Sequence, residues 1–260
     1  MSEPAVSRLE VNGASPANDE LRALLLSGYG HFTAMQVRDG RVRGLDLHLA
    51  RLANGNAELF GSGLDADRIR ALVRHALDAD TDASVRVHIQ RPHPADPPSV
   101  TVIVRPSAGM PAERRLQSVP YQRSVAHIKH LGDFGQHYYG LLAERNGFDE
   151  ALLTGQDGLI SEGSVTNIGF FDGTAVVWPA APMLAGITMQ VLQRELRRAG
   201  IAQRQTPVRL ADLGAFASVF VTNSRGVAAV TRVDDQAIGV DCDLMKQLAE
   251  SYESASADEI

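Results

Sequence analysis

The sequence has little of what would indicate a secreted or membrane-bound protein. It contains a single cysteine, Cys242, so no disulfide can form within the chain, which favours a reducing cytoplasm. No apolar run approaches the ~20 residues that a helix needs to span a bilayer. The N-terminal stretch carries Glu3, Arg8 and Glu10 where a signal peptide requires an uninterrupted apolar core. We therefore expect a cytoplasmic protein that does not bind membranes.

The charges also lack any concentration of one sign. The 25 Lys and Arg residues are scattered among 31 Asp and Glu residues, and the net charge is -6. Neither a nucleic-acid surface nor a polybasic membrane patch is predicted. With 260 residues, of which 44% are apolar, the chain is typical of a globular protein with one large domain or two lobes. Composition alone names no function.

Local patterns predict a small N-terminal lobe at residues 1–106. A strand over 32–37 is followed by Asp39-Gly40, a strong signal for a hairpin turn. Helical spacing and strand alternation predict further elements: helices from Asp46 and over 67–78, and strands over 85–89 and 100–104. Residues 107–119 lack periodicity and contain Gly109 and Pro111, so we expect an interdomain linker there.

Residues 120–260 predict a larger C-terminal lobe. A helix over 133–145 precedes short apolar strands whose turns are marked by Asp157-Gly158 and Asp172-Gly173. A second helix begins near Gly186 and is closed by Gly200, and a strand follows over 218–222. The last predicted helix, over 243–252, is followed by what reads as a frayed acidic tail. Together the two lobes predict an α+β fold.

One stretch, residues 127–173, carries the most chemical information. It joins Lys129, just before a helix, to the strand-end tetrapeptide Ile160-Ser161-Glu162-Gly163. Read together with Gly186-Ile187-Thr188, it resembles the fold-type IV enzymes that use pyridoxal 5'-phosphate (PLP). This family includes branched-chain and D-amino-acid aminotransferases and aminodeoxychorismate lyase. The resemblance implies the two-lobed fold of D-amino-acid aminotransferase, with the cofactor between the lobes, and a homodimer.

The resemblance assigns the central roles to Lys129 and Glu162. PLP chemistry needs a lysine that forms an imine (Schiff base) with the cofactor aldehyde and, once displaced, moves a proton. PLP withdraws electrons while its ring nitrogen is protonated, a state that a buried carboxylate beside it favours. Lys129 and Glu162 match these positions, and the following Thr166 and Asn167 also fit the family segment. Each residue alone would fit a solvated surface position, whereas the combination favours function.

Three further motifs resemble the family's phosphate site. A phosphate is held by backbone N–H groups at a helix N-terminus and by a fixed cation. Gly186, Ile187 and Thr188 match the helix start, and Thr222, Asn223 and Ser224 match a second clasp after a strand. Arg51, in His48-Leu49-Ala50-Arg51-Leu52, matches the arginine of the first lobe. Each motif alone also fits an ordinary helix start, strand end or surface charge; their order along the chain makes the resemblance specific.

Several departures concern the substrate. Phe32 is followed by Thr33 where many members have glutamate, a feature similar to the lyase branch, and Phe134 replaces a tyrosine of branched-chain aminotransferases. Arg91 and His93 have the spacing of a carboxylate trap in the D-amino-acid enzymes, although Arg91 also fits an ordinary loop arginine. The rival arginines for a substrate carboxylate are Arg38, Arg86 and Arg225.

The leading hypothesis is a class IV aminotransferase that transfers an amino group between an amino acid or amine and a keto acid through Lys129. The alternative is a 4-amino-4-deoxychorismate lyase that releases pyruvate, with Thr33 among its catalytic residues. A third hypothesis is a non-catalytic scaffold of the same fold. No metal site is predicted, because His127, His130 and His137 lack a completing ligand cluster.

Overall fold

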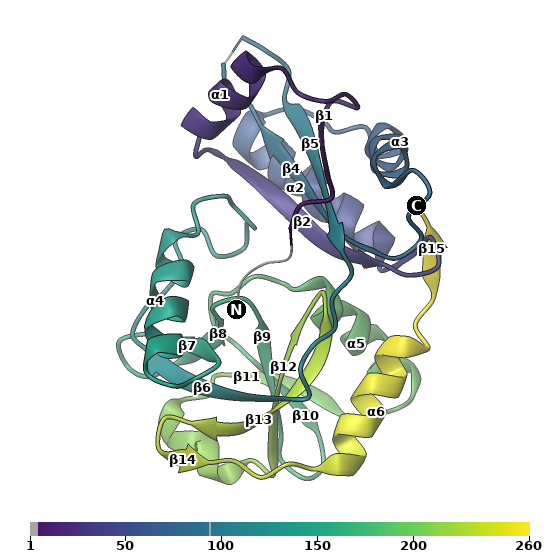
Figure 1. Ribbon diagram of the computed structural model, residues 1–260. Coiled ribbons are helices and arrows are strands. Elements are labelled where there is room, and N and C mark those ends of the chain that lie inside the picture. Colours follow the sequence, from purple (N-terminus) through teal and green to yellow (C-terminus); the bar gives the residue numbers. More distant parts are fainter. Residues whose placement is uncertain (1–4, 94) are drawn as a thin grey trace. The chain divides into compact units, whose positions relative to one another are not determined.

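The computed structural model describes residues 5–93 and 95–260 (Figure 1). Its contacts divide the chain into two compact units. Unit 1 contains the described residues up to Ala108, together with Ile128–Gly132 and Ser256–Ile260. Unit 2 contains Gly109–His127 and Asp133–Ala255. Two short segments distant in sequence therefore complete unit 1.

Unit 1 is built on a four-stranded antiparallel sheet with the order β1-β5-β4-β2. Its strands are β1 (Arg8–Val11), β2 (Gly30–Val37), β4 (Ala83–Gln90) and β5 (Ser99–Pro106). Alternating residues such as Val85, Val87 and Ile89 are fully buried, and they pack against α2 (Leu45–Phe60) and α3 (Ala66–Leu77). The other elements are α1 (Asn18–Leu26), β3 (Arg41–Arg43) and β15 (Ala257–Glu259). One sheet face thus forms the core, and the opposite face carries more polar side chains.

The expected hairpin turn in unit 1 is confirmed. Asp39 and Gly40 have positive φ angles of 50° and 69°, and Arg38 and Arg41 exchange backbone hydrogen bonds across the turn. Such left-handed positions favour glycine and aspartate. The acidic tail is not frayed as expected: β15 pairs with β3, and Ile260 is buried in the unit 1 core. An apolar residue at the end of a polar stretch gives little signal in the sequence.

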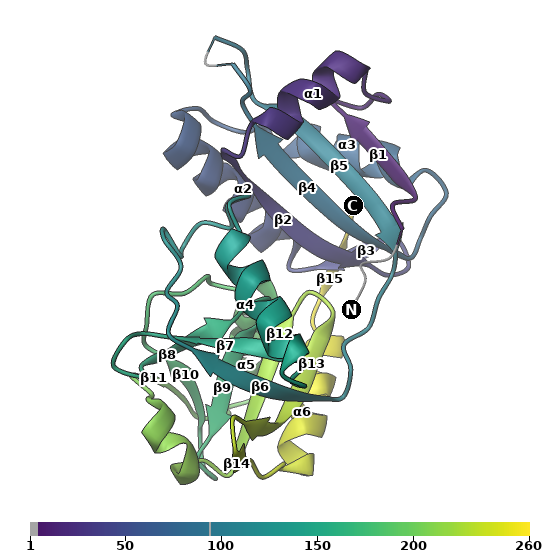
Figure 2. The same ribbon diagram turned by 60° about the vertical axis from the view of Figure 1, so that its left-hand side comes forward.

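Unit 2 contains a nine-stranded sheet. Eight strands follow one another in the order β11-β10-β9-β12-β13-β6-β7-β8, and the ninth, β14, pairs with β13. The strands are β6 (Glu113–Val119), β7 (Glu150–Thr154), β8 (Ile160–Gly163), β9 (Asn167–Phe171), β10 (Val176–Pro179), β11 (Gln203–Thr206), β12 (Ser218–Asn223), β13 (Gly226–Val233) and β14 (Gln236–Ala237). Helix α4 (Phe134–Arg145) crosses β6 and β7 (Figure 2). Helices α5 (Ile187–Arg198) and α6 (Cys242–Glu253) pack together against β12 and β13, and a short 3-10 helix spans Leu210–Ala215.

Two boundaries differ from the sequence expectation. The expected linker over 107–119 is wrong in its second half, because Glu113–Val119 forms β6, which pairs in parallel with β7 and β13 and buries Leu116 completely. Three consecutive charged residues at its start hide the strand pattern. The segment Ile128–Gly132, which we assigned to the C-terminal lobe, clusters with unit 1. The cause is direct, since Phe32 N donates to Lys129 O at 2.8 Å.

Candidate active site

Lys129 lies beside the edge strand β2 of unit 1. His31 and His130 form a β-bridge, and Leu131 N donates to Gly30 O at 3.0 Å. The Lys129 side chain is half-buried, and its Nζ lies 4.7 Å from the centre of the Phe32 ring. The backbone pairing fixes the position of the Lys129 main chain, and the aromatic face attracts the cationic form of its side chain. Half-burial has the opposite effect, because it disfavours the cation, and such a partly desolvated setting suits a reactive amine.

Behind Phe32, Thr33 points into the core of unit 1. Its hydroxyl is 2.7 Å from His48 Nδ1, and the two residues are 0% and 3% exposed. Burial lowers the pKa of His48 to about 3, with a smaller effect from the nearby Arg51 charge. His48 is therefore neutral, and one hydrogen joins its ring nitrogen and the Thr33 hydroxyl. Arg51 follows one helical turn later on α2 and is half-buried.

The opposite face of β2 and β4 gathers nitrogen-containing side chains around Phe32. The Phe32 ring centre is 5.2 Å from the His88 ring and 6.0 Å from the Arg86 guanidinium carbon. Phe32 pairs with His88, and the adjacent Ala34 pairs with Arg86, so strand alternation puts Phe32, Arg86 and His88 on one face. Lys129 and Arg86 thus contact the same aromatic ring.

The predicted carboxylate trap has a different environment. Arg91 donates from Nη1 to Phe60 O at 3.1 Å and from Nη2 to Ser62 Oγ at 3.2 Å, and it stacks on the Phe60 ring. His93 is exposed. Arg38 donates to the carbonyl oxygens of Val37 and Ala108. These contacts give Arg91 a structural role at the end of α2, and the trap stays a prediction.

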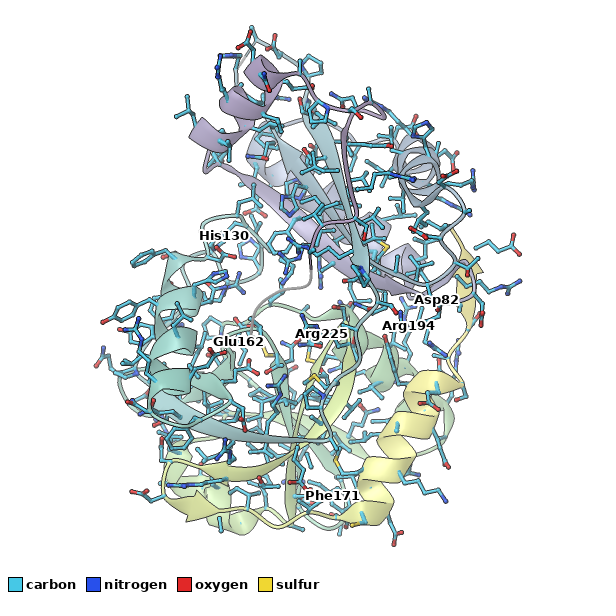
Figure 3. All side chains as sticks on the ribbon, in the orientation of Figure 1. Asp82, His130, Glu162, Phe171, Arg194 and Arg225 are labelled. Atoms are coloured by element: carbon cyan, nitrogen blue, oxygen red, sulfur yellow. The ribbon has the colours of Figure 1, made fainter. Side chains whose placement is uncertain are left out.

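In unit 2, Glu162 is buried at the end of β8 and forms an ion pair with Arg123 (Figure 3 labels Glu162). Arg123 Nη1 donates to Glu162 Oε1 at 3.1 Å and to Ala126 O at 3.1 Å. Leu184 N donates to Glu162 Oε2 at 3.3 Å. A buried carboxylate is tolerated when it is paired and hydrogen-bonded in this way. The sequence analysis missed Arg123, because nothing in its local pattern distinguishes it from a surface arginine.

Asn167, the first residue of β9, links this region to the start of α5. Its Nδ2 donates to Leu184 O at 2.7 Å. Its Oδ1 lies so close to Gly186 that a Cβ there would be only 1.8 Å away. Only glycine fits this close approach. No side chain of the described residues caps α5, so the first N–H groups from Ile187 onward keep the anion-binding character of a helix N-terminus.

The end of β12 is tied to the first turn of α5. Thr188 Oγ1 donates to Asn223 O at 2.7 Å, and Asn223 Oδ1 accepts from Arg225 N at 2.8 Å. The wholly buried Thr222 Oγ1 has no hydrogen-bond partner among the described residues. Ser224 is half-buried in the turn that follows, next to Arg225 (labelled in Figure 3).

These groups in unit 2 suit PLP. A buried carboxylate fits a protonated ring nitrogen, uncapped helix amides fit a phosphate, and an unsatisfied buried hydroxyl fits a polar ligand atom. Thr166 donates its hydroxyl to Glu150 Oε1 at 2.9 Å, and its expected place at the cofactor stays a prediction. Glu150 is a second buried residue that the sequence analysis missed.

Across 5–93 and 95–260, no three or more His, Cys, Asp or Glu side chains are grouped so that they could hold a metal ion. Within the same ranges, none of the helices is both long enough and apolar enough to cross a membrane.

Solved structures share this fold. The T.th. branched-chain amino acid aminotransferase complexed with N-(5'-phosphopyridoxyl)-L-glutamate superimposes with a TM-score of 0.82 at 20% identity, covering 97% of this chain and 94% of that one. The fold IV-transaminase CpuTA1 from Curtobacterium pusillum gives 0.78 at 23% identity, covering 89% and 88%. The PLP-bound form of a hypothetical aminotransferase from Mycobacterium tuberculosis gives 0.82 at 21% identity, covering 96% and 98%. The expected fold-type IV architecture is confirmed.

Sequence comparisons identify the family. A probable branched-chain-amino-acid aminotransferase from Rickettsia typhi is 27% identical over 115 residues, which are 42% of this chain. The match spans only 40% of that relative's length. The family model for class IV amino-transferases matches residues 30–233, and the resemblance seen in the sequence is thereby confirmed. The chain belongs to the class IV aminotransferase family.

Proposed function

We propose that the protein is a PLP-dependent aminotransferase that transfers an amino group between an amino acid or amine and a keto acid. The observation that carries the proposal is the arrangement in unit 2. Leu184 N donates to Glu162, Leu184 O accepts from Asn167, and Asn167 lies against Gly186 at the start of α5. One set of contacts therefore joins the carboxylate that we assign to the cofactor ring to the helix N-terminus that we assign to the cofactor phosphate. Bound PLP would supply an electron sink for the electrons of a broken bond at the substrate α-carbon.

Lys129 supplies the reactive amine. It would hold the cofactor through its aldehyde, and its amine, once released, would move a proton at the substrate α-carbon. Its half-buried position against Phe32 supports this role. Glu162, paired with Arg123, would hold the proton on the ring nitrogen.

The phosphate is assigned to the N–H groups at Ile187 and Thr188, to the β12 end residues Thr222, Asn223 and Ser224, and to the Arg51 cation. The support is the uncapped start of α5 and the buried Thr222 hydroxyl without a partner among the described residues. Such amides and a fixed cation are the usual groups that hold a phosphate.

For the substrate carboxylate, we favour Arg86. It contacts the same Phe32 ring as the Lys129 amine. Arg225, on the turn after β12, is the rival in unit 2. A planar guanidinium can hold a carboxylate through two parallel hydrogen bonds.

The alternatives have less support. The family model and the compared proteins carry aminotransferase names, and the Thr33 hydroxyl that suggested a lyase is buried against His48. A non-catalytic scaffold would have no physical need for a buried Arg123–Glu162 pair beside an uncapped helix.

We also propose a cytoplasmic homodimer. The single Cys242 supports a reducing compartment. On α4, Phe134, Tyr138 and Leu141 are 80%, 53% and 53% exposed at helical spacing, and the first two rings stack at 6.1 Å. Contiguous exposed apolar side chains commonly indicate a protein interface, so this stripe is our candidate for the dimer contact.

The first test is the visible absorption of the purified protein with added PLP, before and after borohydride. Wild type should show a yellow absorption band, and reduction should attach the cofactor covalently to Lys129. Lys129→Ala should show neither the band nor the attachment. A wild type that stays colourless with added PLP would refute the proposal. Given an amino donor without a keto acid, an aminotransferase should accumulate pyridoxamine phosphate together with the keto product, whereas a lyase should not.

A further inference from the structure

Glu150 is a buried carboxyl group for which the proposed chemistry has no use. It opens β7 in unit 2 and is 3% exposed. Burial raises the pKa of its carboxyl group. A buried carboxyl group is costly unless hydrogen bonds compensate for the lost water. Its presence therefore calls for a specific set of contacts.

The hydrogen bonds to its Oε1 come from one turn, and Arg114 adds a nearby positive charge. Glu150 Oε1 accepts from Val165 N at 2.8 Å and from Thr166 Oγ1 at 2.9 Å. The turn is closed by Gly163 N, which donates to Thr166 O at 2.8 Å. A Cβ at Gly163 would lie 2.4 Å from Glu150 Oε1 and 2.2 Å from Thr166 Oγ1. The turn is thus packed directly onto the carboxyl group, and a displacement of one requires a displacement of the other.

This turn, residues 163–166, connects the groups that we assign to the cofactor. Glu162 immediately precedes it and Asn167 immediately follows it, and both are hydrogen-bonded to Leu184. At the tip of the turn, Val165 O accepts a long hydrogen bond of 3.4 Å from Asn223 Nδ2. The Glu162 carboxylate and the groups beside α5 therefore depend on the position of one four-residue turn.

We propose that Glu150 is a positioning residue for the cofactor: as the acceptor for Val165 N and Thr166 Oγ1, it fixes the turn that sets Glu162 and Asn167. This inference rests on the proposed function. Glu150 itself touches neither cofactor nor substrate in this account. What matters is the acceptor oxygen, so a neutral side chain that keeps this oxygen should substitute for it.

The test compares variants of the full-length protein. Glu150→Gln keeps an acceptor oxygen, and Glu150→Met removes it at similar length. Thr166→Val removes one of the two donated hydrogen bonds with almost no change in shape, and Thr166→Ser keeps it. For each variant, PLP is titrated by absorbance to obtain Kd, the pH midpoint of the bound cofactor's absorption band is measured, and Tm is recorded without PLP.

We expect Glu150→Met to raise the Kd for PLP at least about tenfold, as for the loss of hydrogen bonds to a polar or charged group, and to shift the pH midpoint. The Kd values of Glu150→Gln and Thr166→Ser should stay within about threefold of the wild-type value. The Kd of Thr166→Val should be higher than that of Thr166→Ser. A lowered Tm alone, with wild-type Kd and band, would indicate a purely structural role and overturn the inference.

Two further outcomes also decide the question. If Glu150→Gln weakens PLP binding as much as Glu150→Met, the acceptor oxygen is not what matters, and the inference is wrong. If Glu150→Met does not fold, the threonine pair decides: equal Kd values for Thr166→Val and Thr166→Ser overturn it. A wild type that does not bind PLP refutes the proposed function itself, which separates the two failures.

Discussion

Arg123 and Glu162 form an ion pair of 3.1 Å inside unit 2, where their side chains are 4% and 6% exposed. Removing one partner of a buried pair leaves the other charge uncompensated, which typically costs ~3–5 kcal/mol. We predict that Arg123→Met lowers the free energy of unfolding by roughly that amount and weakens PLP binding. Chemical denaturation and PLP titration measure the two effects.

The matched control is the exposed pair between Arg115 and Asp149, at 3.0 Å. Because solvent screens exposed ion pairs, Arg115→Met should change stability far less than Arg123→Met and should leave PLP binding unchanged. Equal losses of unfolding free energy in the two variants would contradict the role of burial.

Gly186 gives a second prediction. Because a Cβ there would lie 1.8 Å from Asn167 Oδ1, Gly186→Ala must push Asn167 or the start of α5 aside. We expect the Kd for PLP to rise at least about tenfold, the equivalent of ~1.4 kcal/mol. Gly214→Ala is the control, since its Cβ would meet only the Gln236 side chain, at 3.6 Å. If both alanine variants bind PLP like wild type, the start of α5 does not hold the phosphate.

The substrate assignment predicts a kinetic contrast between two arginines. Arg86→Met should raise KM for the keto acid by roughly 30- to 100-fold, the loss of a charge-assisted carboxylate contact, while Kd for PLP changes little. Arg91→Met should instead lower Tm, because Arg91 holds Phe60 O and Ser62 Oγ. A large KM effect at Arg91 with none at Arg86 would reverse the assignment. Steady-state kinetics and thermal unfolding distinguish these cases.

Two buried histidines predict a loss of stability in mild acid. Burial lowers the pKa of His31 to about 4 and that of His48 to about 3. Between pH 6.5 and these values, the unfolded chain binds protons that the folded chain excludes, so stability falls as pH falls. At about 1.4 kcal/mol per pH unit, His31 accounts for roughly 3 kcal/mol between pH 6.5 and 4.

Unfolding measured at several pH values tests this dependence. His48→Gln removes the titrating ring but keeps a hydrogen-bonding group for Thr33, so its stability should depend less steeply on pH below 6.5. His137→Gln changes an exposed histidine and should follow wild type. A wild-type protein whose stability is constant from pH 7 to 4 would contradict the prediction.

The features that the sequence predicted correctly depend on neighbours along the chain. The turn at Asp39-Gly40, the helix α3 and the glycine that closes α5 depend on residues within a few positions. By contrast, Arg123 acts on a residue 39 positions away, and Glu150 acts on a turn 15 and 16 positions further on. Such contacts depend on which strands become neighbours, and short-range patterns do not determine that.

The pairing of β15 with β3, and the burial of Ile260 in the unit 1 core, have a consequence for how the protein is made. Translation proceeds from the N-terminus, and domains generally begin to fold during synthesis. Unit 1 cannot complete its core until residues 256–260 have been made, after every residue of unit 2. The first unit to be synthesised is therefore the last to be finished, and expression of residues 5–108 alone would yield a product lacking a strand and part of its apolar interior.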